Sequence, residues 1–204
     1  MQNWYIQRRY RLTSKGDYSI TRSYMELRNA RTKLANAELI STSVAQPKHR
    51  FIMWLVVHNR LLSKERLGKL NIPVEEATCC LCDYQVIETA NHLFSGCPWF
   101  QEVKRGVKQW TGSHLQLGDL KTVLKRIKKM KWKQFQRELV AATWGAMVYH
   151  TWKARNWMLF KGTHVQAAEI VIIQIKREIL ARVDILSSSK KAHRCRNLVQ
   201  QLQM

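Results

Sequence analysis

Four residues of metal-binding type near the middle of the chain constrain its fold most. Cys79, Cys82, His92 and Cys97 follow the spacing C-x2-C-x9-H-x4-C. Three thiolates and one imidazole are donors that Zn²⁺ takes in closed tetrahedral structural sites, where no position is left for a catalytic water. The spacing therefore predicts one structural zinc ion around which the neighbouring chain folds.

The second ligand pair needs a local turn of its own. His92 and Cys97 are about one and a half helical turns apart. We expect a short helix or turn that starts near Asn91 to bring both side chains to the ion, with Leu93 and Phe94 facing the core.

Other ligand sets remain open at this point. Cys80 could replace Cys79, although C-x-C is a less natural clasp, and His58 or His114 could complete an irregular site. Buried thiols or a disulfide are the alternatives to zinc, and Cys80 and Cys195 are interpreted as small buried side chains. Five cysteines, an odd number with four in a metal pattern, suit a reducing compartment.

Short motifs surround the predicted ligands. They are Cys79-Cys80-Leu81-Cys82, Glu88-Thr89, His92-Leu93-Phe94 and Cys97-Pro98. This stretch resembles the reverse-transcriptase zinc-binding domain, which follows the polymerase in non-LTR (LINE-type) retrotransposons of plants. The resemblance implies a zinc-binding accessory segment of a retroelement protein.

Flanking segments extend the resemblance over roughly residues 14 to 162. The similar segments are Gly16 to Tyr24, Pro47-Lys48-His49-Arg50-Phe51 with Trp54-Leu55, Leu61-Leu62-Ser63 with Arg66-Leu67, and Trp152-Lys153-Ala154-Arg155-Asn156 with Phe160. The last of these resembles a W-x-x-R-N-x-x-x-F element that commonly follows the domain. Residues 113–138 match no pattern of the family.

The chain lacks the residue patterns of the enzymes it might be confused with. A polymerase holds two metal ions on clustered carboxylates, yet the chain has only 14 acidic residues, no two adjacent Asp and no Y-x-D-D-like turn. The H-x-E of zinc deaminases and the glycine patterns of phosphate-binding loops are absent too. We therefore expect no catalytic residues, no small-molecule substrate and no enzymatic activity.

Net charge indicates the class of partner. The chain carries 35 Lys and Arg against 14 acidic residues, a net charge of +21 and a pI near 10.2. Such a charge favours polyanions, and binding to nucleic acid should weaken steeply with salt. RNA or single-stranded DNA is the expected partner, although charge alone confers no sequence specificity.

The basic residues are densest between Lys121 and Arg137. The candidate nucleic-acid-binding residues are Lys121, Lys125, Arg126, Lys128, Lys129, Lys131 and Lys133. Leu120, Val123, Leu124, Ile127 and Met130 recur at three- and four-residue steps, which predicts a helix that buries this stripe and holds the lysines outward. A merely solvated helix face and a nuclear localisation patch are the competing interpretations.

Aromatic residues near the predicted metal site suggest a second kind of contact. Trp99 could stack on an exposed base of a single strand, as aromatic rings of zinc knuckles do, or it could pack in the core. Trp152, Arg155 and Asn156 are interpreted first as helix packing with a solvent-facing Arg.

The predicted fold class is mainly α, a helical domain with a small CCHC zinc-binding loop between helices. Helices are predicted over residues 20–39, 47–62, 98–110, 138–160 and 167–186. We divide the chain into a reverse-transcriptase zinc-binding-like domain (14–112), a basic helix with a C-terminal helical region (113–186), and a basic tail that is expected to lack stable structure (187–204).

The longest uncharged apolar run, Leu139 to Tyr149, is too short to span a bilayer. We expect an intracellular protein of nucleus or cytoplasm, without organellar targeting.

The favoured function is a zinc-binding, nucleic-acid-binding fragment of a LINE-type reverse transcriptase without polymerase activity. The alternatives are a zinc-stapled helical scaffold for protein partners, and a retroelement remnant with no selected function.

Overall fold

Helices dominate the structure, a computed structural model that describes residues 37–112, 118–162, 164–195, 197, 200 and 202. These residues contain no β-strand, so the predicted mainly α fold is confirmed. Contacts group residues 36–204 into one compact unit. The predicted helix over residues 20–39 and the family-like segment from Gly16 to Tyr24 lie outside the described residues, except for the short helix α3 (Ala37–Ile40).

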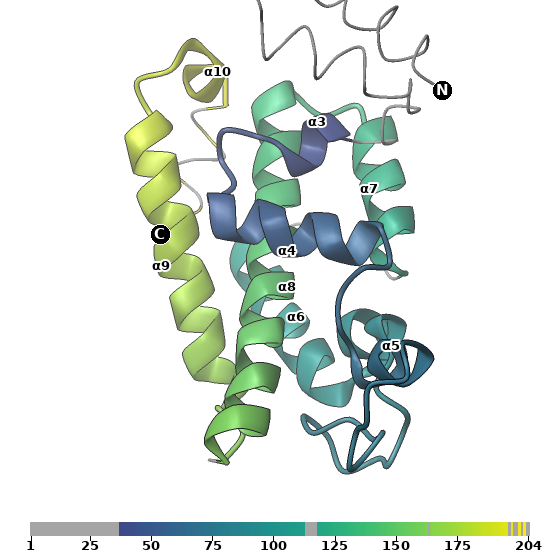
Figure 1. Ribbon diagram of the computed structural model, residues 1–204. Coiled ribbons are helices and arrows are strands. Elements are labelled where there is room, and N and C mark those ends of the chain that lie inside the picture. The colour runs from purple at the N-terminus through teal and green to yellow at the C-terminus, as the bar shows by residue number, and fades with distance from the viewer. Residues whose placement is uncertain are drawn as a thin grey trace, which may run out of the picture. The chain divides into compact units, whose positions relative to one another are not determined.

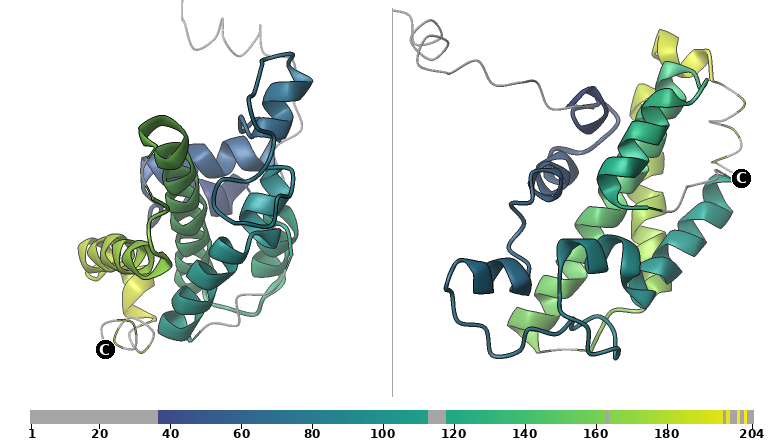
Figure 2. Two further views of the ribbon diagram at one scale, coloured as in Figure 1. Left: turned by 90° about the horizontal axis from the view of Figure 1, so that it is seen from below. Right: turned by 90° about the vertical axis from the view of Figure 1, so that its right-hand side faces the viewer.

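Helix α8 (Gln134–Lys161) is the centre of the fold. Every residue from 138 to 148 is buried, as expected of a helix that is covered on all sides. It contacts α3, α4 (Pro47–Val57), α6 (Pro98–Thr111), α7 (Leu120–Lys129) and α9 (Ala168–Leu186). Helix α4 crosses in front of α8 in Figure 1, and Figure 2 shows α8 between α4 on one side and α6 on the other.

The ends of several helices follow from proline and glycine. Pro98 stands in the first turn of α6, and Gly112 ends that helix with a left-handed φ of 56°, as the sequence predicts. Helix α4 also starts at its proline but ends at Val57, earlier than the predicted Leu62. Asn59 takes a left-handed φ of 54°, which the helix cannot continue through.

The remaining elements are short. They are α5 (Lys64–Lys69), the π-helix η1 (His92–Gly96) and α10 (Lys190–His193). Part of the predicted basic tail is packed: Ala192 and Cys195 are buried, and the Trp110 indole N–H donates to the backbone oxygen of Leu202 at 3.1 Å. No helix among the described residues is both long and apolar enough to cross a membrane.

Three buried aromatic rings join the middle of the chain to the central helix. The Phe94 and Phe100 rings meet edge to face with centroids 6.2 Å apart, and the Phe100 and Trp144 centroids are 6.1 Å apart. Because these rings come from η1, α6 and α8, they connect the candidate metal-binding region to the core of the helical domain.

Removing the middle ring tests this connection. We expect Phe100→Ala to lower the free energy of unfolding in urea by about 3–5 kcal/mol, because the side chain is fully buried and its removal leaves a cavity. Phe160→Ala is the matched control, since Phe160 is 77% exposed. Equal destabilisation by the two substitutions would contradict the packing described here.

Candidate metal centre

The four predicted ligands converge. One donor atom from each of Cys79, Cys82, His92 and Cys97 lies within 4.8 Å of the other three, and Cys82 Sγ is 3.4 Å from His92 Nε2. A tetrahedral zinc ion with Zn–S near 2.3 Å and Zn–N near 2.0–2.1 Å separates its ligand atoms by about 3.5–3.8 Å. The donor set and its spacing therefore fit one zinc ion with little rearrangement.

A tight turn positions the first two ligands. Thr78 and Ile87 form an isolated antiparallel bridge, and the Cys79 N–H donates to the backbone oxygen of Val86 at 2.9 Å. Gln85 takes a left-handed φ of 49° in the return segment. The cysteine pair thus sits where the chain reverses direction, with Leu81 buried between the two cysteines.

The π-helix η1 positions the other two ligands. Five residues along an α-helix would place His92 and Cys97 about 140° apart around the axis. Instead the Cys97 N–H donates to the His92 carbonyl at 2.7 Å, an i→i+5 bond that widens the turn and brings the two residues to one side. Leu93 and Phe94 are buried, as predicted.

The alternative ligands lie elsewhere. Cys80 is outside the cluster, with its Sγ 3.8 Å from the Arg155 carbonyl oxygen. His58 is exposed and lies against the Trp54 ring, with centroids 4.7 Å apart. His114 lies outside the described residues. All five cysteines are free, so no disulfide competes for the predicted ligands.

Hydrogen bonding and burial shift the pKa values of the three clustered thiols in different directions. A hydrogen bond with Cys79 lowers the pKa of Cys97, and backbone N–H groups of Trp99 and Phe100 at the start of α6 lower it further. The same bond raises the pKa of the Cys79 thiol, and burial raises that of Cys82. A zinc ion that binds here would displace protons from the thiols of Cys79 and Cys82, whose pKa values are raised, so its affinity should fall with falling pH.

A buried ion pair connects this site to the central helix. Arg155 Nη2 lies 2.6 Å from Glu88 Oε1, and Nε lies 3.0 Å from both carboxylate oxygens. Both side chains are buried. The expectation of a solvent-facing Arg155 is therefore wrong: the guanidinium points inward because a buried carboxylate needs a charged partner.

Glu88 serves a second element as well. Its Oε1 accepts from the backbone N–H of Lys64 at 2.9 Å, and its own N–H donates to the Ala77 carbonyl at 2.8 Å. One carboxylate thus connects the metal loop, defined here as residues 71–97, with α5 and α8. Glu88 was noted in the sequence only as part of the Glu88-Thr89 motif, and its ion pair was not predicted.

The predicted nucleic-acid-binding lysines are all exposed, but they are not all on one helix. Helix α7 ends at Lys129, so Lys131 and Lys133 lie in the link to α8. Trp99 is 8% exposed, and its indole N–H donates to the Gln166 carbonyl at 2.9 Å. That ring therefore packs in the core and is not presented to a base.

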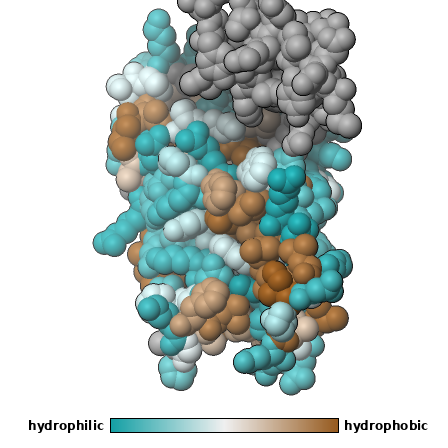
Figure 3. All heavy atoms as spheres, viewed as in Figure 1, coloured by the Kyte–Doolittle hydropathy of each residue, from teal (hydrophilic) through white to brown (hydrophobic). Residues whose placement is uncertain are grey.

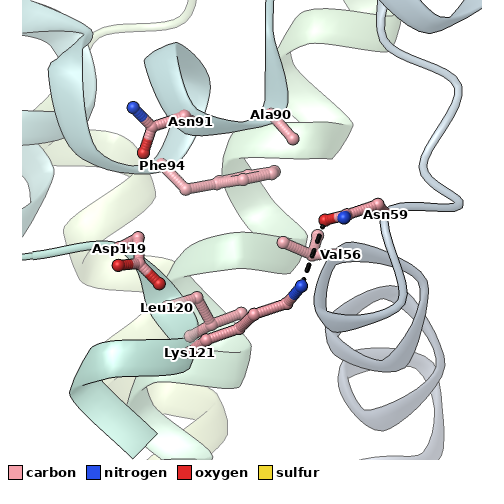
Figure 4. A pocket seen from close by; sticks show the side chains of 8 residues that line it. All are labelled: Val56, Asn59, Ala90, Asn91, Phe94, Asp119, Leu120 and Lys121. Carbon is pink, nitrogen blue, oxygen red and sulfur yellow. Dashed lines mark hydrogen bonds between the residues drawn. The ribbon is translucent and has the colours of Figure 1, made fainter.

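A pocket of about 220 Å³ separates the metal loop from α7. Its lining residues are Val56, Asn59, Ala90, Asn91, Phe94, Asp119, Leu120 and Lys121. Figure 4 shows Lys121 extending across it toward Asn59, with 3.4 Å between Nζ and Oδ1. Lys121, the first lysine of α7, thus lines the same pocket as Ala90 and Asn91, which directly precede His92.

Substitution of neighbouring cysteines separates ligand from non-ligand. We expect Cys82→Ser to lose the ion and to increase the exposure of Phe94, because the metal would no longer order the loop that carries this ring. Cys80→Ser, the matched control in the same turn, should retain the ion. The measurement is the sulfur-to-metal charge-transfer absorption of the Co²⁺-loaded full chain. Intact absorption in Cys82→Ser would refute the ligand assignment.

The ion pair is tested by a double-mutant cycle. Arg155→Met should lower the free energy of unfolding by about 3–5 kcal/mol, because it leaves the Glu88 carboxylate buried and unpaired. Adding Glu88→Gln should recover part of that stability. Arg105→Met, at an exposed site on α6, is the control. Additive effects of the two substitutions, measured by urea unfolding, would argue against the pair.

Comparison with known proteins points to one family. Residues 18–103, less than half of the chain, match the family model described as zinc-binding in reverse transcriptase. No curated protein and no solved structure matches the chain. The matched segment contains all four convergent ligands and Glu88, and it ends before Arg155. The match and the ligand cluster together support a zinc-binding segment of the reverse-transcriptase type within this chain.

Proposed function

We propose that the chain is a nucleic-acid-binding fragment of a LINE-type reverse transcriptase, in which a structural zinc ion supports a surface for single-stranded RNA or DNA. The observation that carries the proposal is an exposed basic face, formed by α7 and the link that follows it, beside the metal loop. This basic face comprises Lys121, Lys125, Arg126, Lys128, Lys129, Lys131 and Lys133.

The amphipathic packing of α7 presents this face to solvent. Leu120, Val123, Leu124 and Ile127 are buried, whereas the lysines and Arg126 are exposed. Residues at i, i+4 and i+8 follow one side of a helix, so Lys121, Lys125 and Lys129 form a row with about 6 Å of axial rise between neighbours. A row of this kind suits contacts to successive phosphates.

In the part of the chain that the structure describes, one lysine of the basic face forms an ion pair with an acidic side chain. Lys128 pairs with Glu38 at 2.7 Å, and both side chains are more than half exposed, so the pair is weak and open to exchange. Asp119 is engaged as the N-cap of α7, where it accepts from the Thr122 N–H at 3.0 Å. The positive field of the remaining lysines is therefore available to a polyanion.

The pocket beside the metal loop suits an unstacked base. Phe94 and Leu120 contribute apolar surface, Asn59 and Asn91 contribute amides that both donate and accept, and Lys121 stands at the edge where a phosphate would follow. This arrangement favours a flexible single strand, whose bases can leave the stack, over a rigid duplex.

Absence of polymerase activity is part of the proposal. The family match is to a zinc-binding accessory segment only. A polymerase needs a cluster of carboxylates for two metal ions, and the 14 acidic residues of the chain contain no such motif. We accordingly place the fragment inside the cell with nucleic acid, in nucleus or cytoplasm.

A protein partner is the second candidate. Phe51, Trp54 and Leu62 are exposed by 60%, 37% and 47%. Figure 3 shows hydrophobic side chains gathered over α4 and the chain leading to α5. Exposed apolar patches of this kind mark interaction sites, so a zinc-stapled scaffold for proteins is the alternative to nucleic-acid binding.

Removal of three lysines tests the proposal. In a titration of fluorescent single-stranded RNA at several salt concentrations, changing Lys125, Lys129 and Lys131 to Ala should weaken binding. The log-log salt slope should fall by about 0.7 for each phosphate that the variant no longer neutralises. The control removes the same charge elsewhere, with Lys108, Lys153 and Lys161, all exposed, changed to Ala. Equal weakening by both triple variants would show that only net charge attracts the strand.

A further inference from the structure

A second group of metal-binding side chains lies where α4, α8 and α9 meet. It consists of His49, His150 and Glu178, with one donor atom of each within 4.8 Å of the others. His49 Nε2 is 2.8 Å from Glu178 Oε2, and His150 Nε2 is 3.3 Å from the same oxygen. The two imidazoles are almost fully buried, whereas Glu178 is 22% exposed.

The buried imidazole of His49 lies close to the Glu178 carboxylate but is poorly aligned with it. Neither Nδ1 nor Nε2 has a hydrogen-bond partner in the part of the chain that the structure describes, although Nε2 is so near the carboxylate. A buried polar atom without a partner destabilises the fold, because it has lost its hydrogen bonds to water. The Nε2 atom therefore points into the cluster without the alignment that a simple histidine-carboxylate hydrogen bond would have.

We propose that His49, His150 and Glu178 bind a second divalent metal ion of the zinc class. Two imidazole nitrogens and one carboxylate oxygen are a donor set that zinc accepts in sites that keep one position open. Ligand atoms around such an ion are separated by about 3.3–3.4 Å, and two of the observed separations are 2.8 and 3.3 Å. Glu178 is 22% exposed, so solvent reaches one side of the cluster.

The surroundings of the cluster fit a ligand shell. Lys48 Nζ lies 2.7 Å from Glu178 Oε1, the oxygen that the two histidines do not approach. Lys48 can therefore orient the carboxylate while Oε2 binds the ion, as outer-shell partners of metal ligands do. The Lys48 ammonium also lies 4.9 Å from the centroid of the Tyr149 ring, and the lysine side chain is 42% exposed.

A glycine permits the close approach that builds this cluster. A Cβ atom at Gly145 would lie 3.5 Å from His49 Cβ and 3.3 Å from Met53 Sδ, so α4 packs directly against the backbone of α8. The site is separate from the metal loop, and its ligands belong to three helices that the loop does not include.

The test uses the full chain, loaded first with one equivalent of Co²⁺. This first ion should bind at the cysteine-containing site, where it gives sulfur-to-metal charge-transfer absorption. A second equivalent should add visible d–d bands but no further sulfur-to-metal charge transfer, because no sulfur ligand belongs to this site. Glu178→Gln and His150→Gln should each reduce the affinity for this second ion by more than about 100-fold. Glu169→Gln, an exposed change on the same helix, is the control.

Two outcomes would overturn the proposal. One is wild-type protein that binds only the thiolate-coordinated ion at micromolar metal, a result that does not depend on whether any variant folds. The other is an equal affinity of Glu178→Gln and Glu169→Gln for the second ion. That result would assign the second ion to surface histidines. Cys82→Ser should keep the second ion, so failure of the first metal centre and failure of this one are distinguishable.

Discussion

Convergence of Cys79, Cys82, His92 and Cys97 on one point is the constraint on which the middle of the structure depends. The chain between α5 and η1 has no helix and only one isolated bridge. A long segment without secondary structure is uncommon inside a compact domain unless something else orders it. Four donor atoms around one metal ion would supply that order, because metal binding would contribute free energy that the loop does not obtain from apolar residues left exposed, such as Ile72, Val86 and Ile87.

The order at the metal loop reaches the helical core by two routes. Phe94 and Phe100 extend a line of buried rings to Trp144 at the centre of α8. Glu88 connects the loop to the same helix through the buried Arg155 guanidinium. Metal binding and packing of α8 should therefore support each other, although the family match ends well before that helix.

Local features of the structure were predictable from sequence. The ligand quartet follows from donor chemistry and short spacing, and α6 is bounded by Pro98 and Gly112, whose backbone preferences act at their own positions. The i→i+5 turn of η1 was not predictable in detail. Nothing in the amino-acid sequence distinguishes it from an ordinary α-helical turn, which would separate His92 from Cys97.

Long-range features could not be predicted from one sequence. Arg155 resembles any basic residue on a helix surface until its partner, 67 residues away in the chain, is known. His49, His150 and Glu178 likewise have no shared motif, and only the crossing of three helices brings them together. Trp99 was open to two interpretations, and its burial depends on the segment around Gln166 that accepts its N–H.

The most direct test of the account is zinc K-edge X-ray absorption of the full chain with one equivalent of zinc. The account predicts a first shell of three sulfurs near 2.3 Å and one nitrogen near 2.0–2.1 Å, as a Cys3His site requires. A shell of nitrogen and oxygen only would contradict it, because the ion would then avoid the thiolates and the metal loop would have no ordering ligand.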